Sequence, residues 1–307
     1  MIKKELLENV IYNTIKKGAT RLPKDVRTFF EDAIVRETSV NSKNSFSNTL
    51  KSINISETMD KPTCPDTGWP IFYFKIGNNA CLEGGIMALE DATRRMVTRA
   101  TKEGYLRNTM KHPLTGYDPG TNVGLNIPDF TYQFVPGEDF QVTYVAKGGG
   151  SECFGGTRHR MIAFADGVAG IEKFIIDAYV ASTRAGAICP PSILGIGIGG
   201  PANVAANLAK QAACLRLVGS HHPEPIIAEM EKNLYSAINK LGIGAMGTGG
   251  DISVMSVNIE YAYTHIAGVA VATSSNCWIA RRRTQKIYAA DGKVEELDDP
   301  NWFERRL

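Results

Sequence analysis

Three cysteines beside turn-forming residues are the first groups in this sequence whose chemistry calls for an explanation. Cys64 lies in "TCPDTG", Cys189 in "ICPPS" and Cys277 in "NCWIARRRT". Proline and glycine hold the backbone away from helix and present side chains at loop tips. Three thiolates from separate loops could bind three corners of an iron–sulfur cubane, whose fourth iron would act as a Lewis acid. Their spacing matches no local metal motif, so buried structural thiols are the alternative from spacing alone.

The composition limits the classes of partner. The chain has 307 residues, with 34 basic and 32 acidic side chains and a net charge of +2. This charge is too small for sequence-independent binding of nucleic acid. No apolar run approaches the roughly 20 residues of a membrane helix, and the start, "MIKKELLENVIYNTIKKG", has helical spacing unlike a signal peptide. We therefore expect a cytoplasmic protein with reduced thiols, no membrane partner and no nucleic-acid partner.

Strand-like and helical segments alternate along the chain without a linker or repeat. This pattern predicts an α/β fold, a mixed sheet with surrounding helices, in a single domain over residues 1–307. Residues 1–60 are expected to be helical, and residues 61–307 to form the mixed α/β region. The stretch "DFTYQFVPGEDFQVTYVAKGGG" predicts two strands joined as a hairpin at Pro136-Gly137.

The glycine-rich stretch "GIGIGG", Gly195 to Gly200, matches the dinucleotide pattern GxGxxG between an expected strand and helix. A dinucleotide fold also needs an acidic residue about 20 residues later, at the end of a second strand. Here that region reads "VGSHHPEP", and its first acid, Glu224, is expected to open a helix. We interpret the glycines as permitting close packing of strand and helix, with a dinucleotide-binding oxidoreductase as the less favoured alternative.

Seven motifs along nearly the whole chain resemble the α subunit of the iron–sulfur hydro-lyases of the class I fumarate hydratase and L(+)-tartrate dehydratase family. They are "CPDTG", "HPLTGYDPGTNVGLN", "AKGGGS", "CPPSILGIGIGG", "GSHHPEP", "LGIGAMGTGGDISVM" and "CWIARRRT". The resemblance implies a [4Fe-4S] cluster held by Cys64, Cys189 and Cys277, with the fourth iron open to substrate. It also implies the reversible addition or removal of water on a small C4 dicarboxylate, either fumarate with (S)-malate or L-tartrate to oxaloacetate.

The resemblance implies roles for five further residues. Asp66 matches a catalytic acid, although an Asx turn would equally explain it. His265 matches a catalytic histidine of the substrate pocket. Arg107 matches an arginine that clamps a substrate carboxylate, and Gly149 and Gly150 would offer backbone N–H groups to a second carboxylate.

The chain departs from the family pattern at two places. Pro65 stands where many relatives carry a substrate-contacting glutamine, and "SECFGGTRHRM", residues 151–161, differs from the common form. The other cysteines fall outside the matching motifs and are expected to be structural thiols: Cys81, Cys153 and Cys214. The run Arg281, Arg282 and Arg283 is compatible either with positive potential near the cluster or with a surface patch.

Fused relatives continue into a second domain, whereas this sequence ends soon after "CWIARRRTQKIYAADG". The resemblance therefore implies a separate β subunit that completes the active site, in a hetero-oligomer of α2β2 type. A cluster-binding scaffold or iron sensor without turnover is the alternative from another class, and Pro65 is its one hint. The motifs do not choose between fumarate and tartrate.

Overall fold

The computed structural model describes residues 1–154, 156–186 and 188–304. The chain divides into two compact units, and each is built from separate stretches of sequence. Unit 1 comprises Met1–Pro23, Ile53–Lys147 and Arg281–Pro300, and unit 2 comprises Lys24–Ser52, Gly148–Ala280 and Asn301–Leu307.

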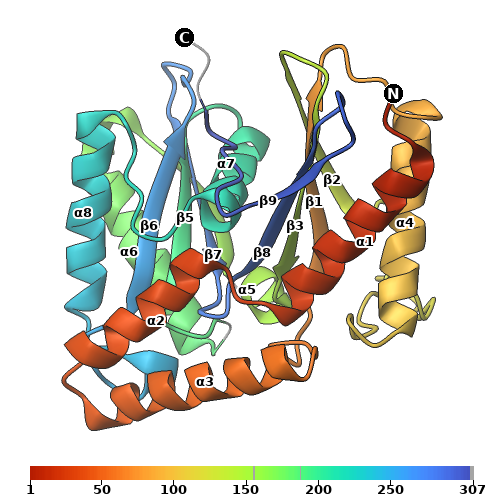
Figure 1. Cartoon of the computed structure of the whole chain (residues 1–307). Coiled ribbons are helices and arrows are strands. Elements are labelled where there is room, and N and C mark those ends of the chain that lie inside the picture. Colours follow the sequence, from red (N-terminus) through yellow and green to blue (C-terminus); the bar gives the residue numbers. More distant parts are fainter. Residues whose placement is uncertain (155, 187, 305–307) are drawn as a thin grey trace. The chain divides into compact units, whose positions relative to one another are not determined.

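Unit 1 is a five-stranded mixed sheet in the order β2-β1-β3-β8-β9. Its strands are β1 (Trp69–Gly77), β2 (Asp129–Val135), β3 (Phe140–Lys147), β8 (Arg281–Ile287) and β9 (Val294–Leu297). Helices α1 (Lys4–Thr20) and α4 (Gly85–Lys102) lie side by side against this sheet (Figure 1). Apolar residues of α1, α4, β1 and β3 share one core, in which Phe72, Phe74 and Phe140 are fully buried. The helical periodicity of α1 thus serves to cover the sheet.

The predicted hairpin at Pro136-Gly137 is wrong, because β2 and β3 are not neighbours in the sheet. Strand β1 lies between them, parallel to β2 and antiparallel to β3. The end of β1 bonds to the turn itself: the Gly77 N–H donates to the carbonyl of Asp139 at 2.8 Å. A Cβ on Gly77 would stand 2.4 Å from the carbonyl oxygen of Gly137, so only glycine fits there. Pro136-Gly137 reverses the chain as predicted, but a strand from earlier in the sequence takes the central position.

Unit 2 is a four-stranded mixed sheet in the order β4-β7-β5-β6. Its strands are β4 (Thr157–Ile162), β5 (Ser192–Ile198), β6 (Val254–Tyr261) and β7 (Val269–Asn276). Its helices are α2 (Lys24–Arg36), the first part of α3 (Val40–Thr58), α5 (Gly149–Cys153), α6 (Gly167–Arg184), α7 (Ala202–Leu215) and α8 (Pro225–Asn239). Short 3-10 turns occur at Phe164–Asp166 and Ala245–Gly247. Helices α6 and α8 cover one face of the sheet and α7 covers the other (Figure 1).

The glycines of "GIGIGG" let α7 approach β5 closely. A Cβ on Gly195 would stand 2.1 Å from the carbonyl oxygen of Ala209, and one on Gly197 would stand 1.9 Å from that of Ala205. Any side chain at either position would collide with helix backbone, which cannot give way. The interpretation of these glycines as packing residues is confirmed.

The predicted α/β class with mixed sheets is confirmed, and residues 4–58 are helical apart from their connections. The helical residues do not form a part of their own, since α1 belongs to unit 1 and α2 to unit 2. In the described parts of the chain, no helix combines the length and apolar character needed to cross a membrane.

Candidate active site

Two of the three predicted cluster ligands lie at one edge of the unit 2 sheet. Strands β5 and β7 are antiparallel, with Ile193 opposite Asn276, so the start of β5 and the end of β7 meet. Cys189 precedes β5 and Cys277 follows β7. The backbone N–H of Trp278 donates to the carbonyl oxygen of Cys189 at 3.1 Å, which joins the two cysteine turns directly. We call this end of the sheet the cysteine edge.

The predicted carboxylate-binding glycines reach the same edge. Gly149 and Gly150 open α5, which leads into β4, and the antiparallel pairing of β4 with β7 puts the start of β4 opposite Ser274, near the end of β7. The N–H of Ser275 donates to the carbonyl of Gly156 at 2.9 Å, so the chain after α5 is tied to β7 just before Cys277. The structure therefore brings these two glycines and two of the cysteines to the cysteine edge.

An ion pair fixes α5 from the side. Lys210 on α7 contacts Glu152 on α5, with 2.7 Å between Nζ and Oε1, and both side chains are mostly buried. Inside the turn, the hydroxyl of Ser151 donates to the carbonyl of Gly148 at 2.8 Å. The glycines thus belong to a turn whose position is set by charge pairing with a neighbouring helix.

A buried tyrosine supports the cysteine edge from the α6 side. The hydroxyl of Tyr179 donates to the carbonyl of Ser253 at 2.6 Å and accepts from the hydroxyl of Ser192 at 3.1 Å. Burial is the main cause that raises the pKa of Tyr179, and the electrostatic effect of Cys277 raises it further. Hydrogen bonding with Ser192 lowers the pKa but does not outweigh the burial. Tyr179 is therefore a neutral phenol that fixes the start of β5.

The third predicted ligand and two predicted substrate residues belong to unit 1. Cys64 and Asp66 are half-buried in the segment that leads into β1, and Oδ1 of Asp66 accepts from the N–H of Gly68 at 3.0 Å. That contact is the Asx turn considered from the sequence. The buried hydroxyl oxygen of Thr67 accepts from the N–H of Arg107 at 2.8 Å, so Arg107 lies beside this segment. The structure places the backbone of Arg107 against Thr67, the residue that follows Asp66, and Arg107 itself is exposed.

The structure does not bring His265 to the cysteine edge. His265 precedes β7 and Cys277 follows it, so the whole extended strand separates them. A strand of this length spans about 25 Å. His265 is exposed in the loop between β6 and β7, where its Nδ1 accepts from the N–H of Ala267 at 3.1 Å. The role of His265 in the substrate pocket therefore stays a prediction, and within unit 2 the extended strand keeps it away from the cysteine edge.

The environments of the cysteines fit a cluster at the three predicted positions. All six cysteines are free thiols, and Cys64, Cys189 and Cys277 are the half-buried ones. A half-buried thiol in a turn can reach a cluster while the surrounding protein shields it. Among the described residues, no group of three or more His, Cys, Asp and Glu side chains is gathered around one point in the manner of a metal site.

The expectation of structural thiols outside the motifs holds for one cysteine. Cys214 is 1% exposed, inside the packing of α7. Cys81 and Cys153 are exposed, so neither packs as a core thiol. Cys153 ends α5, and residue 155 in the atypical segment 151–161 lies outside the described residues.

Arg281, whose role the sequence leaves undecided, has an unusual environment in the structure. Arg281 begins β8 and is 2% exposed, yet its Nε and Nη1 have no hydrogen-bond partner in the described parts of the chain. A buried guanidinium with two unpartnered nitrogens is costly, so this position suits an anion. Arg281 follows Cys277 by four residues, which limits their Cα separation to about 14 Å. The signal in the sequence was a cation at the start of a strand, shortly after a cysteine that is predicted to be a ligand.

The other two arginines of the run have different surroundings. Arg283 forms an ion pair with Glu296 on β9, and Arg282 is 5% exposed. A surface patch is therefore excluded for Arg281 and Arg282.

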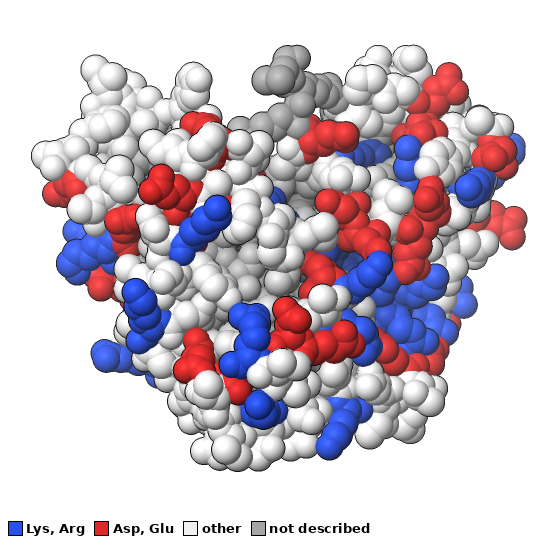
Figure 2. Space-filling model, turned by 60° about the vertical axis from the view of Figure 1, so that its left-hand side comes forward, with Lys and Arg blue, Asp and Glu red and all other residues white. Residues whose placement is uncertain are grey.

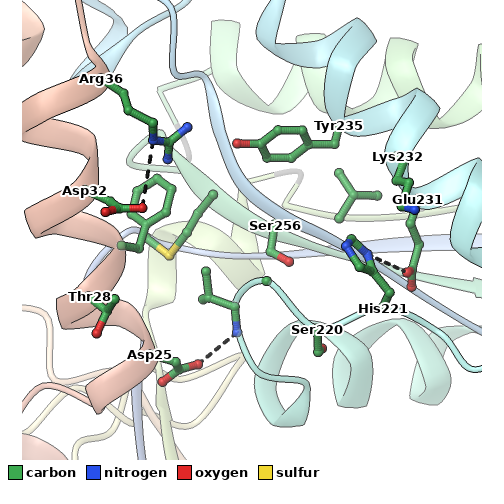
Figure 3. A pocket seen from close by; sticks show the side chains of 15 residues that line it. Asp25, Thr28, Asp32, Arg36, Ser220, His221, Glu231, Lys232, Tyr235 and Ser256 are labelled. Atoms are coloured by element: carbon green, nitrogen blue, oxygen red, sulfur yellow. Dashed lines mark hydrogen bonds and ion pairs between the residues drawn. The ribbon is translucent and has the colours of Figure 1, made fainter.

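A separate cavity of about 450 Å³ lies in unit 2 between α2 and α8 (Figure 3). It contains none of the predicted site residues. Its acids already serve the fold: Asp25 accepts from the N–H of Val218 at 2.9 Å, and Glu231 accepts from the N–H of Ile259 at 2.8 Å. This cavity does not compete with the cysteine edge as the catalytic site.

The motif "GSHHPEP" has a structural explanation next to that cavity. Glu231 on α8 and Glu260 on β6 are both buried, and Nη1 of Arg216 contacts them at 3.4 and 2.9 Å. The backbone N–H of His222 donates to Glu231 at 2.9 Å, and Nδ1 of His221 lies 3.7 Å from the same carboxylate. The motif holds the α7–α8 connection onto the sheet through this buried ion cluster.

The surface charge agrees with the composition. On the face drawn in Figure 2, uncharged residues cover much of the area, and acidic and basic side chains lie interspersed among them. The mixture of both signs on this face is in line with the small net charge of +2.

Comparison with known proteins agrees with the resemblance. The family model described as fumarate hydratase (Fumerase) matches residues 8–286. A Methanocaldococcus jannaschii protein, whose name provisionally assigns it as an L(+)-tartrate dehydratase subunit alpha, is 39% identical over 283 residues, covering 92% of this chain and 97% of that protein. The L(+)-tartrate dehydratase subunits alpha of Escherichia coli strains UTI89 and K12 are 33% and 32% identical, and each match covers 92% of this chain and 91% of the relative. The chain belongs to the fumarate hydratase (Fumerase) family and is a hydro-lyase subunit of the alpha type.

Proposed function

We propose that this chain is the α subunit of a cytoplasmic L(+)-tartrate dehydratase that holds a [4Fe-4S] cluster. The observation that carries the proposal is the contact between the Cys189 and Cys277 turns at the cysteine edge, beside the glycine turn of α5. Tartrate is favoured over fumarate because the relatives that match over nine-tenths of both chains bear that name. The product of tartrate dehydration is oxaloacetate.

Cys64, Cys189 and Cys277 are the residues that would hold the cluster. When bound, the cluster supplies a Lewis acid that polarises the C–O bond of the leaving hydroxyl group. The Trp278 to Cys189 bond fixes two of these thiols on a rigid sheet edge, and Tyr179 holds the start of β5 in place. Such support from outside the ligands keeps them oriented.

The substrate is a dianion, and this chain supplies cationic and N–H groups for its two carboxylates. Arg107 would bind one carboxylate through its guanidinium, and the backbone N–H groups of Gly149 and Gly150 would bind the other. Arg281, with its unpartnered Nε and Nη1, would stabilise the negative charge that develops during proton removal. Asp66, half-buried beside Arg107, would hold or move a proton of the substrate hydroxyl group.

The chain would act with a β subunit that supplies the remaining catalytic groups. The relatives are named as alpha subunits, which supports the existence of such a partner. We therefore expect the α subunit alone to bind the cluster and to turn over little substrate. An α2β2 assembly is the stoichiometry that we propose.

The test begins with anaerobic reconstitution of the chain with iron and sulfide. Absorption near 400 nm and about four irons per chain are expected for the wild type, and both should be lost in Cys64→Ala, Cys189→Ala and Cys277→Ala. Cys153→Ala is the matched control, because its exposed thiol lies at the end of α5 and should leave the iron count unchanged. A chromophore that is indifferent to the three predicted ligands would refute the cluster.

Activity with the β subunit then separates the remaining candidates. The reconstituted complex should dehydrate L-tartrate faster than it hydrates fumarate. Preference for fumarate would make the complex a fumarase, which the family description also accommodates. A complete cluster with neither activity would point to the scaffold or iron sensor.

A further inference from the structure

The loop that follows α4, whose course is drawn in Figure 1, contains three large apolar side chains that are exposed to solvent. We call residues 108–126 the apolar loop. In it Leu114 is 91% exposed, Tyr117 70% and Leu125 93%. Single exposed apolar residues are ordinary, but several on one short segment mark an interaction surface.

Leu114 is presented by a turn that backbone hydrogen bonds close. The N–H of His112 donates to the carbonyl of Tyr117 at 2.8 Å, and the N–H of Gly116 donates back to the carbonyl of His112 at 3.0 Å. Nδ1 of His112 accepts from the N–H of Leu114 at 3.3 Å and from that of Thr115 at 3.2 Å. The exposed leucine therefore stands on a backbone of fixed shape.

Leu125 is presented in the same manner by a second turn. Gly124 and Ile127 exchange backbone hydrogen bonds of 3.1 Å, with Leu125 and Asn126 at the tip. Asn126 adopts a left-handed φ of 60°, a conformation that asparagine tolerates in tight turns. Because both turns are already ordered, a partner that binds them pays little conformational entropy.

The base of the apolar loop holds a predicted substrate residue. Asn122 is 1% exposed, and its Oδ1 accepts from the N–H groups of Thr109 and Met110 at 2.9 and 3.2 Å. Its Nδ2 donates to the carbonyl of Arg107 at 2.9 Å and to the hydroxyl of Thr101 at 3.1 Å. One buried amide thus fixes both the apolar loop and the backbone of Arg107.

We propose that the apolar loop is the surface on which the β subunit docks, with Leu114 and Leu125 as its principal contacts. The inference rests on the proposed function, which requires a second subunit close to Arg107. Because Asn122 ties the apolar loop to the backbone of Arg107, a partner bound to this loop lies close to Arg107. A second copy of this chain would not supply the catalytic groups that the β subunit is proposed to bring. The loop has few charges, so the contact is apolar and depends weakly on salt.

The experiment uses the full chain and a tagged β-subunit homologue from the same organism. Leu114→Asp with Leu125→Asp is compared with Val35→Asp and Ile226→Asp, which introduce the same charges at exposed apolar positions of α2 and α8. Affinity for the β subunit is measured by biolayer interferometry, and iron and sulfide per chain are measured in parallel. We expect the loop variant to bind at least about tenfold more weakly, as for hot-spot residues, with an unchanged iron content. The control variant should bind like the wild type.

Hydrogen exchange of the wild-type complex supplies a second measurement, in which amides of the apolar loop should slow on binding. Wild-type affinity in the loop variant, or no binding of the β subunit to the wild-type chain, overturns the inference. Loss of self-association with β binding retained also overturns it, because the loop would then join two copies of this chain. Failure of the proposed function would give a different result. The α–β complex would still form through the apolar loop, but it would lack the cluster or the activity.

Discussion

His265 and Cys277 stand at opposite ends of β7, about 25 Å apart by the rise of an extended strand. Cys189 lies at the Cys277 end, through the bond from the N–H of Trp278. Within unit 2, the predicted site residues that lie at the cysteine edge are therefore the two glycines of α5 and the two cysteines. His265 belongs to the β6–β7 loop.

The first prediction follows from that separation. His265→Asn should leave the iron content unchanged and change kcat by no more than about threefold, the range expected for exposed positions away from reacting groups. The measurement is steady-state turnover of the α–β complex with iron counting on the same sample. A loss of a hundredfold with an intact cluster would show that His265 reaches substrate in the assembled enzyme.

The second prediction concerns the buried guanidinium of Arg281. Arg281→Met should raise KM for the dicarboxylate or lower kcat by about tenfold to a thousandfold, as expected for loss of a preorganised cationic group. Arg281→Lys should recover little, because a lysine cannot replace the guanidinium geometry. Kinetics at several substrate concentrations would separate KM from kcat. Equal activity of both variants and the wild type would show that Arg281 does not act on an anion.

The third prediction tests whether the Lys210–Glu152 ion pair positions the glycine turn. Lys210→Met should raise KM several-fold at unchanged iron content, because α5 loses its tie to α7 while the cysteines keep theirs. Lys210→Arg should restore most of the affinity, since it can still pair with the carboxylate. A purely structural role would instead lower the melting temperature of Lys210→Met with an unchanged KM.

Much of the fold and part of the site could be predicted from the sequence, and the failures have physical causes. Helical periodicity and glycine spacing are local, so α1 and the close approach at Gly197 were predicted correctly. The position of β1 between β2 and β3 was not, because strand order depends on contacts between distant segments. The distance of His265 from the cysteine edge could not be predicted for a related reason, since separation in sequence does not give separation in space until the strand is known. Arg281 was left undecided because only burial distinguishes a ligand-facing arginine from a surface one.

The fourth prediction is a pH dependence at the end of α3. The pKa of Asp60 lies below its ordinary value of 3.8, chiefly because Lys16 donates to it, with a further bond from Tyr105, while burial opposes the shift. A lowered folded-state pKa means that the stabilisation is present above about pH 4 and is lost as the pH falls through the folded value. With both side chains about one-third exposed, the contribution is limited to about 1 kcal/mol.

Asp60→Asn should therefore lower the free energy of unfolding more at pH 7 than at pH 3. Urea denaturation of both proteins at the two pH values is the measurement. A difference between variant and wild type that is equal at pH 3 and pH 7 would contradict the linkage.

The fifth prediction tests the packing of β5 against α7. Gly197→Ala should destabilise the chain by about 1–3 kcal/mol or more, the usual cost of overpacking, because its Cβ would meet the carbonyl oxygen of Ala205 at 1.9 Å. Gly124→Ala is the matched control, since a Cβ there meets no atom within 4 Å. Thermal unfolding of the two variants should show a lowered melting temperature for Gly197→Ala alone. Similar melting temperatures would mean that α7 can move away from β5 and that the glycines of "GIGIGG" are required for something other than packing.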